Sequence, residues 1–180
     1  PGCYDDAYIA WVAAHDRDAV EACRVTSPPA CVGPRVEKQP RNTTHPYVFE
    51  GPEHLTHSAF VADQTITFLR AHREETFFAI AGFYAPHAPL NPPQRFVDLY
   101  DPSSLPLPAM NEGENSLGLS DEQWRMVKAH YYALVSHVDD QVGRILSALD
   151  ELGLSDNTIV VFTSDHGEHL GDHGRVQKGP

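Results

Sequence analysis

The sequence predicts an α/β fold with a largely parallel sheet flanked by helices, because segments with helical and strand-like patterns alternate along the chain. Two short runs of apolar and aromatic residues, 77–84 and 158–163, are typical of strands buried on both faces. Each run follows a segment whose apolar residues recur every three or four positions, at 56–72 and at 120–152. This order of helix, strand and loop, repeated once, indicates a parallel sheet.

The first 56 residues have a different character. Residues 5–25 show a loosely helical pattern with a break near residues 15–18. Residues 26–52 contain six prolines, which interrupt any periodicity and predict a long irregular connection.

Two predicted helices and the end of the first predicted strand carry recognisable local signals. The helix over 56–72 is expected to bury side chains such as Phe60 and Leu69, and the first strand should stop at the prolines of 86–89. For the helix over 120–152, Ser120 and Gln123 form a capping box at its start. Gly153 is placed to end that helix.

Charge and hydropathy exclude several classes of partner. The 180 residues contain 13 Lys and Arg against 25 Asp and Glu, a net charge of −12. We expect no nucleic-acid partner and no anionic membrane surface, because both need clustered cations. No stretch approaches the ~20 apolar residues that cross a bilayer. The sequence is compatible with a cytoplasmic, periplasmic or secreted location.

Polar side chains with metal-binding and proton-transfer chemistry follow both predicted strands. His87 follows the first strand, and Asp165 and His166 follow the second, ahead of Lys178. Ligands in open α/β sheets bind beyond the carboxyl ends of the strands. A carboxylate next to an imidazole suits a divalent cation that keeps positions open for other ligands. The sequence therefore predicts a metal-assisted site at these ends.

Four blocks of the sequence resemble the sulfatase family of the alkaline phosphatase superfamily, in the same order and spacing. They are Pro86–Pro89, Tyr131–Arg144, Thr158–Gly167 and Lys178–Pro180. The resemblance is good over residues 57–180 and poor over residues 1–56. It implies an alkaline-phosphatase-like fold, and residues 1–180 would form part of a sulfatase catalytic domain.

The resemblance also implies an activity, a cofactor and site residues. In the family, an oxidised cysteine (formylglycine) attacks sulfur as its hydrate while a calcium-type cation holds the sulfate oxygens. Asp165 and His166 match a pair of metal ligands. His87 matches the histidine that reaches the sulfate and protonates the leaving alcohol, and Lys178 matches the lysine that contacts the sulfate. The implied substrate is a small-molecule or saccharide sulfate ester.

Two parts of the family pattern are missing. Cys31 is followed by Arg35 as in the nucleophile motif, but Gly33 stands where the family has proline, and the motif should lie much further upstream. Asp5 and Asp6 follow no strand, unlike the early metal-binding aspartates. We therefore expect an internal fragment of a larger enzyme, inactive by itself and binding Ca²⁺ weakly or not at all. Exposed sheet edges would favour self-association.

Two other interpretations remain open. A phosphonate monoester or phosphodiester hydrolase of the same superfamily shares the Asp-His pair and the lysine. A non-catalytic remnant would keep the fold without a nucleophile. Among the remaining polar residues, His173 is expected to order its loop, with assistance near the sulfate as the alternative. One of Asp139 and Asp140 is expected to make a buried structural hydrogen bond.

Overall fold

The computed structural model describes residues 7–24 and 44–178. They fall into two compact units. Unit 1 contains the described parts of 1–39 together with 50–85 and 137–161, and unit 2 contains the described parts of 40–49, 86–136 and 162–180. The long helix α5 (Asp121–Glu151) contributes its first half to unit 2 and its second half to unit 1.

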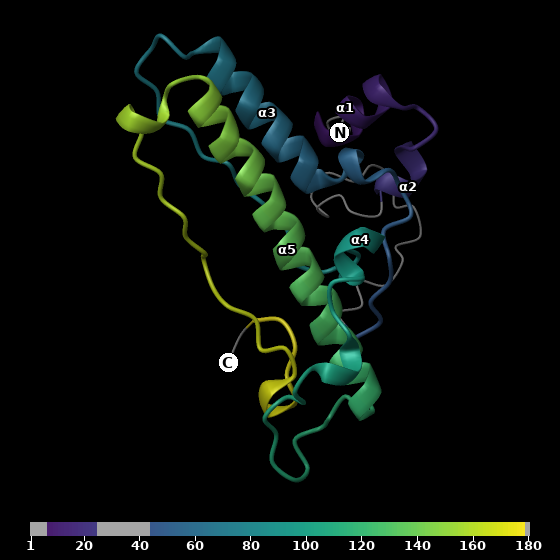
Figure 1. Cartoon of the computed structure of the whole chain (residues 1–180). Helices are drawn as coiled ribbons and strands as arrows, with labels where there is room; N and C mark the ends of the chain where they lie inside the picture. The colour runs from purple at the N-terminus through teal and green to yellow at the C-terminus, as the bar shows by residue number, and fades with distance from the viewer. Residues whose placement is uncertain (1–6, 25–43, 179–180) are drawn as a thin grey trace, which may run out of the picture. The chain divides into compact units, whose positions relative to one another are not determined.

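Unit 1 is built from helices (Figure 1), and its buried side chains include Tyr8, Val12 and Leu55. Its elements are α1 (Ala7–His15), α2 (Val20–Arg24), η2 (Glu53–Leu55), α3 (His57–Ala71), the second half of α5 and η4 (Ser155–Asn157). Tyr8 of α1 is buried and donates a hydrogen bond of 2.7 Å to the Leu55 carbonyl. The Thr56 hydroxyl caps α3 by accepting from the Ala59 amide, and it lies 3.2 Å from Nε2 of His137 in α5.

Unit 2 consists largely of loops held against the first half of α5. Its short helices are α4 (Gln94–Val97), η3 (Pro102–Ser104) and η5 (Asp172–Gly174). Phe96 and Trp124 are buried in it. Lys128 and Arg125 of α5 donate to the carbonyls of Pro106 and Leu105, which fastens the segment after η3 to the helix.

The ends of α5 confirm the local signals in the sequence. The Ser120 amide donates to Oε1 of Gln123 and the Gln123 amide donates to Oγ of Ser120, which completes the capping box. At the other end, Gly153 has φ +69° and the Leu154 amide donates to the Leu149 carbonyl, the hydrogen bond of a Schellman motif. The predicted helix at 56–72 and the break between α1 and α2 are confirmed in the same way.

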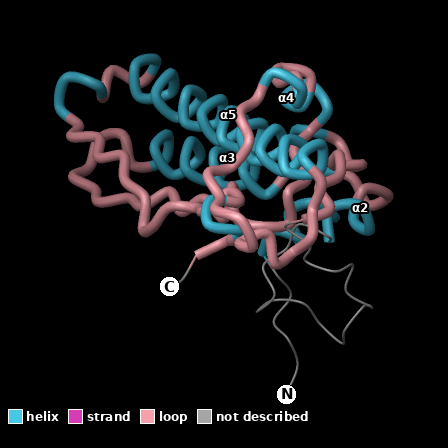
Figure 2. The backbone as a smooth tube through the Cα atoms, turned by 90° about the horizontal axis from the view of Figure 1, so that it is seen from below, coloured by secondary structure: helices cyan, strands magenta, loops and turns pink. Residues whose placement is uncertain are grey.

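The two predicted strands are absent from the structure: residues 7–24 and 44–178 contain no strand. Residues 77–84 and 158–163 are irregular segments with no backbone hydrogen bond to other described residues. The second of them runs as an extended yellow-green trace in Figure 1, and Figure 2 shows helices and loops only. A strand is stable only beside a hydrogen-bonded neighbour, and neither segment has one among the described residues.

The same segments therefore expose side chains that the sequence predicts as buried. Phe78 is 85% exposed and Ile159 is 93% exposed. Val161 and Phe162 are also exposed. The described residues therefore do not show the parallel sheet that the sequence predicts. Within the described residues, no helix combines the length and apolar character needed to cross a bilayer.

Candidate functional site

Asp165 and His166 lie in direct contact at the end of the second exposed segment. Nε2 of His166 is 3.4 Å from Oδ2 of Asp165, and the His166 amide donates to Oδ1 of the same carboxylate at 3.0 Å. Nδ1 of His166 lies 2.7 Å from the Gly167 carbonyl. That contact favours a proton on Nδ1, which leaves Nε2 as the nitrogen available to a metal. The Asp165 side chain is 84% exposed, so its carboxylate oxygens are accessible.

The chain between His166 and Lys178 folds back on itself. The His169 amide donates to the Gln177 carbonyl, and the Gly171 amide donates to the Arg175 carbonyl. One oxygen of the Glu168 carboxylate, Oε1, accepts from the amides of both Leu170 and Gln177. These bonds close residues 168–178 into a loop, here called the return loop, so that Lys178 follows a residue bonded to Glu168.

The tip of the return loop is seated on the chain before α5. The His173 amide donates to the Ala109 carbonyl at 2.8 Å, and the Ala109 amide donates to Oδ1 of Asp172 at 2.9 Å. Gly174 has φ +67°, and a Cβ added there would lie 1.8 Å from the Glu114 carbonyl oxygen. Nδ1 of His173 is 3.5 Å from Oε1 of Glu114. His173 thus contacts the segment that positions the loop, in agreement with the ordering role expected for it.

His87 is half-buried in a segment whose neighbours are packed. Nδ1 of His87 lies 2.9 Å from the Ala88 carbonyl, and Ala88 itself is buried. Two residues after Ala88, the Leu90 carbonyl accepts a hydrogen bond from the Tyr47 amide, which fixes the segment in unit 2. His87, Asp165, His166 and Lys178 all belong to this unit. That they share one pocket stays a prediction.

The donor set of the Asp165–His166 pair fits part of a divalent metal site. Among the residues that the structure describes, no three His, Cys, Asp or Glu side chains are gathered around one point. A hard cation such as Ca²⁺ takes six to eight ligands, mainly oxygens. The pair offers one carboxylate and one imidazole, so further ligands must complete the site.

The other sequence candidates have different outcomes. Cys31, Asp5 and Asp6 lie outside the described residues. Asp139 is exposed on α5, whereas Asp140 is half-buried and accepts a hydrogen bond from the Gln141 side chain. Glu168 was not singled out by the sequence, because its role depends on a bond to an amide nine residues later.

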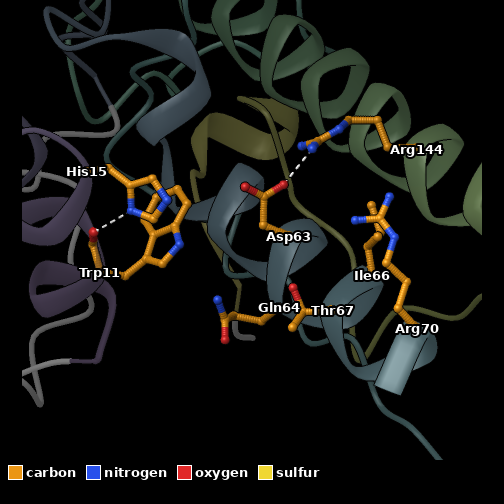
Figure 3. A pocket seen from close by; sticks show the side chains of 8 residues that line it. All are labelled: Trp11, His15, Asp63, Gln64, Ile66, Thr67, Arg70 and Arg144. Atoms are coloured by element: carbon orange, nitrogen blue, oxygen red, sulfur yellow. Dashed lines mark hydrogen bonds and ion pairs between the residues drawn. The ribbon is translucent and has the colours of Figure 1, made fainter. Parts of the chain in front are cut away.

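A groove of about 450 Å³ lies in unit 1, on the surface of α3, and contains none of the predicted site residues. Figure 3 shows Arg144 reaching across it to Asp63, with a nitrogen–oxygen distance of 2.5 Å. Its other lining residues are Trp11, His15, Gln64, Ile66, Thr67 and Arg70. The Asp63–Arg144 ion pair crosses this groove, which is separate in sequence from the Asp165–His166 pair.

Comparisons with known proteins identify the family of this chain. The sulfatase family model matches residues 28–180, a range that includes all four predicted site residues. An arylsulfatase from Clostridium perfringens is 36% identical over 151 residues, covering 76% of this chain and 31% of that protein. Human iduronate 2-sulfatase is 34% identical over 178 residues, covering 82% of this chain and 32% of that protein.

A solved structure agrees with the family match. A phosphonate monoester hydrolase from Silicibacter pomeroyi superposes with a TM-score of 0.68 at 28% identity, over 86% of this chain and 34% of that one. The chain spans about a third of the length of the curated relatives named here. Its helices thus follow the arrangement of an alkaline-phosphatase-like hydrolase. The chain belongs to the sulfatase family.

Proposed function

We propose that this chain supplies part of the active site of a sulfuric ester hydrolase. The observation that carries the proposal is the Asp165–His166 contact, followed by a return loop that leads directly into Lys178. Sulfate esters carry a negative charge that spreads over the sulfate oxygens in the transition state. A site for them therefore needs preorganised positive charge and a proton donor for the leaving alcohol.

In this proposal, Asp165 and His166 hold a divalent cation, which we take to be Ca²⁺. When bound, the cation would withdraw charge from the sulfate oxygens. Among the described residues, the exposed Asp165 carboxylate contacts only His166, through its Nε2 atom and its backbone amide. Asp165→Ala should therefore lower the metal content of the complete natural protein, measured by elemental analysis after dialysis.

Lys178 and His87 have separate roles. Lys178 is a fixed positive charge at neutral pH, so it stabilises the bound sulfate and the charge that develops on it. His87 has an imidazole that can give a proton to the departing alkoxide near neutral pH. Nδ1 of His87 lies close to the Ala88 carbonyl, which favours a form of the imidazole that carries a proton on Nδ1.

The proposal also covers the two exposed apolar segments. We take residues 77–84 and 158–163 to be strands of a parallel sheet in the complete natural protein, with His87 and Asp165 beyond their carboxyl ends. Their unbroken apolar character supports this, because such runs are typical of strands covered on both faces.

A second candidate function has its own support. The Silicibacter pomeroyi structure with a TM-score of 0.68 is a phosphonate monoester hydrolase. Phosphonate monoesters and sulfate monoesters are both tetrahedral monoanions, so a cation, a lysine and an acid would serve either substrate. The two sulfatase relatives, at 34–36% identity, favour sulfate esters.

One comparison separates the two functions. The complete natural protein would be assayed with 4-nitrophenyl sulfate and with a 4-nitrophenyl phosphonate, and kcat/KM compared. A sulfatase should prefer the sulfate ester by at least tenfold, or about 1.4 kcal/mol of transition-state stabilisation. A preference for the phosphonate would overturn the main proposal, and inactivity on both would support a non-catalytic remnant.

A further inference from the structure

Glu168 has an unusual set of partners for a half-buried carboxylate in a loop. Its Oε1 accepts hydrogen bonds from the amides of Leu170 and Gln177, which are seven residues apart in the chain. Both bonds join the carboxylate to main chain, so they are independent of the side chains at 170 and 177. Bonds from amides to an ionised acceptor are stronger than those to a neutral one.

The two residues that donate to Glu168 have strained backbone. Leu170 has φ +49° and Gln177 has φ +69°, and His173 is the other described non-glycine residue with positive φ. Residues with a Cβ rarely adopt this left-handed conformation, and they keep it only where their surroundings hold them there. The Glu168 carboxylate binds the amide of each strained residue, at the two ends of the return loop.

This bonding links both halves of the proposed site. Glu168 comes two residues after His166, and Gln177 immediately precedes Lys178. A backbone hydrogen bond from the His169 amide to the Gln177 carbonyl also joins the start of the return loop to its end. The backbone at Gln177 sets the direction in which the chain enters Lys178, so the position of Lys178 depends on what holds Gln177.

One side chain of α5, Tyr131, also interacts electrostatically with the half-buried Glu168. The pKa of Tyr131 is raised, mainly by burial and additionally by the negative charge of Glu168. Tyr131 and Glu168 both belong to unit 2.

We propose that Glu168 is a positioning residue, which clamps Leu170 and Gln177 in their left-handed conformations and thereby holds Lys178 beside the Asp165–His166 pair. The catalytic part of this inference rests on the proposed function. The clamp itself rests on the two amide bonds alone. The clamp and the positioning of Lys178 are therefore tested by separate experiments.

The clamp is tested by hydrogen–deuterium exchange on the complete natural protein. In Glu168→Ala, the amides of Leu170 and Gln177 should exchange about tenfold faster, the loss expected for a hydrogen bond to a charged acceptor. Glu168→Gln keeps an acceptor oxygen but loses the charge, so its exchange rates should lie between those of the wild type and Glu168→Ala. Glu112→Ala, at an exposed position in the same unit, is the matched control. Unchanged exchange in Glu168→Ala would overturn the clamp.

The positioning of Lys178 is tested by a double-mutant cycle on kcat/KM for an aryl sulfate. Glu168→Ala should reduce kcat/KM by about tenfold in the wild-type background and have almost no effect in Lys178→Ala. A merely structural role would give the same factor in both backgrounds and would overturn the inference. Gln177→Gly relieves the backbone strain, so it should restore part of the activity of Glu168→Ala.

Failure of the proposed function can be distinguished from failure of the clamp. If the wild-type protein hydrolysed no sulfate ester, the assignment of Lys178 to sulfate would be wrong and the catalytic part of this inference with it. The exchange experiment would still decide the clamp. Fast exchange at Leu170 and Gln177 in Glu168→Ala would establish it, and unchanged exchange would refute it.

Discussion

Replacing Gly174 with alanine should release the tip of the return loop from the chain before α5. Gly174 has φ +67°, where a Cβ costs about 1–2 kcal/mol. The added Cβ would also lie 1.8 Å from the Glu114 carbonyl oxygen and 2.7 Å from its carbon, both main-chain atoms that cannot rotate away. Overpacking of this kind costs about 1–3 kcal/mol. The total loss of unfolding free energy should be about 2–5 kcal/mol.

Gly118 provides a matched control for the backbone contribution. It has φ +64°, almost the same as Gly174, but a Cβ added to it meets no atom within 4 Å. Gly118→Ala should therefore cost only about 1–2 kcal/mol. The difference between the two variants isolates the contact between the return loop and Glu114.

Urea unfolding followed by tryptophan fluorescence measures both variants. Trp124 is buried, and its ring would contact a Cβ added at Gly171, so its emission reports on this region. The other tryptophan, Trp11, is replaced by phenylalanine in all variants to leave a single reporter. Equal losses of stability in Gly174→Ala and Gly118→Ala would refute the seating of the loop on residues 109–115.

Three further predictions concern other parts of the molecule. His87→Ala should slow the hydrolysis of alkyl sulfates far more than that of nitrophenyl sulfates, whereas Lys178→Ala should slow the hydrolysis of both by a similar factor. If His87→Ala slowed both reactions equally, His87 would be a sulfate-binding residue and not the proton donor. Burial lowers the pKa of His130 below 6.5, and its hydrogen bond to the Met126 carbonyl offsets only part of this shift. As pH falls, the unfolded chain therefore takes up this proton before the folded chain does, and the free energy of unfolding declines below about pH 6.5. Urea titrations at pH 7.5 and 5.5 should show a smaller decline for His130→Gln than for the wild type. Because Ile159 and Val161 are exposed, the 180-residue chain should self-associate, and lysine at both positions should shift its sedimentation toward the monomer; a monomeric wild-type chain would contradict this.

The helices could be predicted from the sequence because their signals are local. The bounds expected for α5, 120–152, differ by one residue at each end from the observed Asp121–Glu151. Ser120, Gln123 and Gly153 each act on backbone groups within a few residues. Such bonds form wherever the chain is helical, so no distant partner is needed.

The two strands could not be established in the same way. An apolar run such as 158–163 indicates that a segment is suited to burial, but the bonds of a strand come from another segment. Among the described residues no segment pairs with it, and Ile159 remains 93% exposed. The pattern indicates a preference for burial, but it does not identify the segment that would cover or pair with this run.

The sequence pattern pointed to Asp165 and His166, but not to the residue that holds the loop after them. Asp165 and His166 are adjacent in sequence and follow an apolar run, which is a visible pattern. Glu168 acts through the amide of Gln177, and that bond depends on left-handed backbone at Leu170 and Gln177. Neither is glycine, so the sequence carries no sign of the conformation.

The central claim is that His87, Lys178 and the Asp165–His166 pair bind one sulfate ester together. A crystal structure of the complete natural protein soaked with sulfate tests it most directly. We predict one sulfate ion contacted by Lys178, with Nε2 of His87 and the Asp165 carboxylate within about 10 Å of each other, the span of one small ester and its metal. A separation clearly greater than ~10 Å, with the sulfate bound elsewhere, would contradict the shared site.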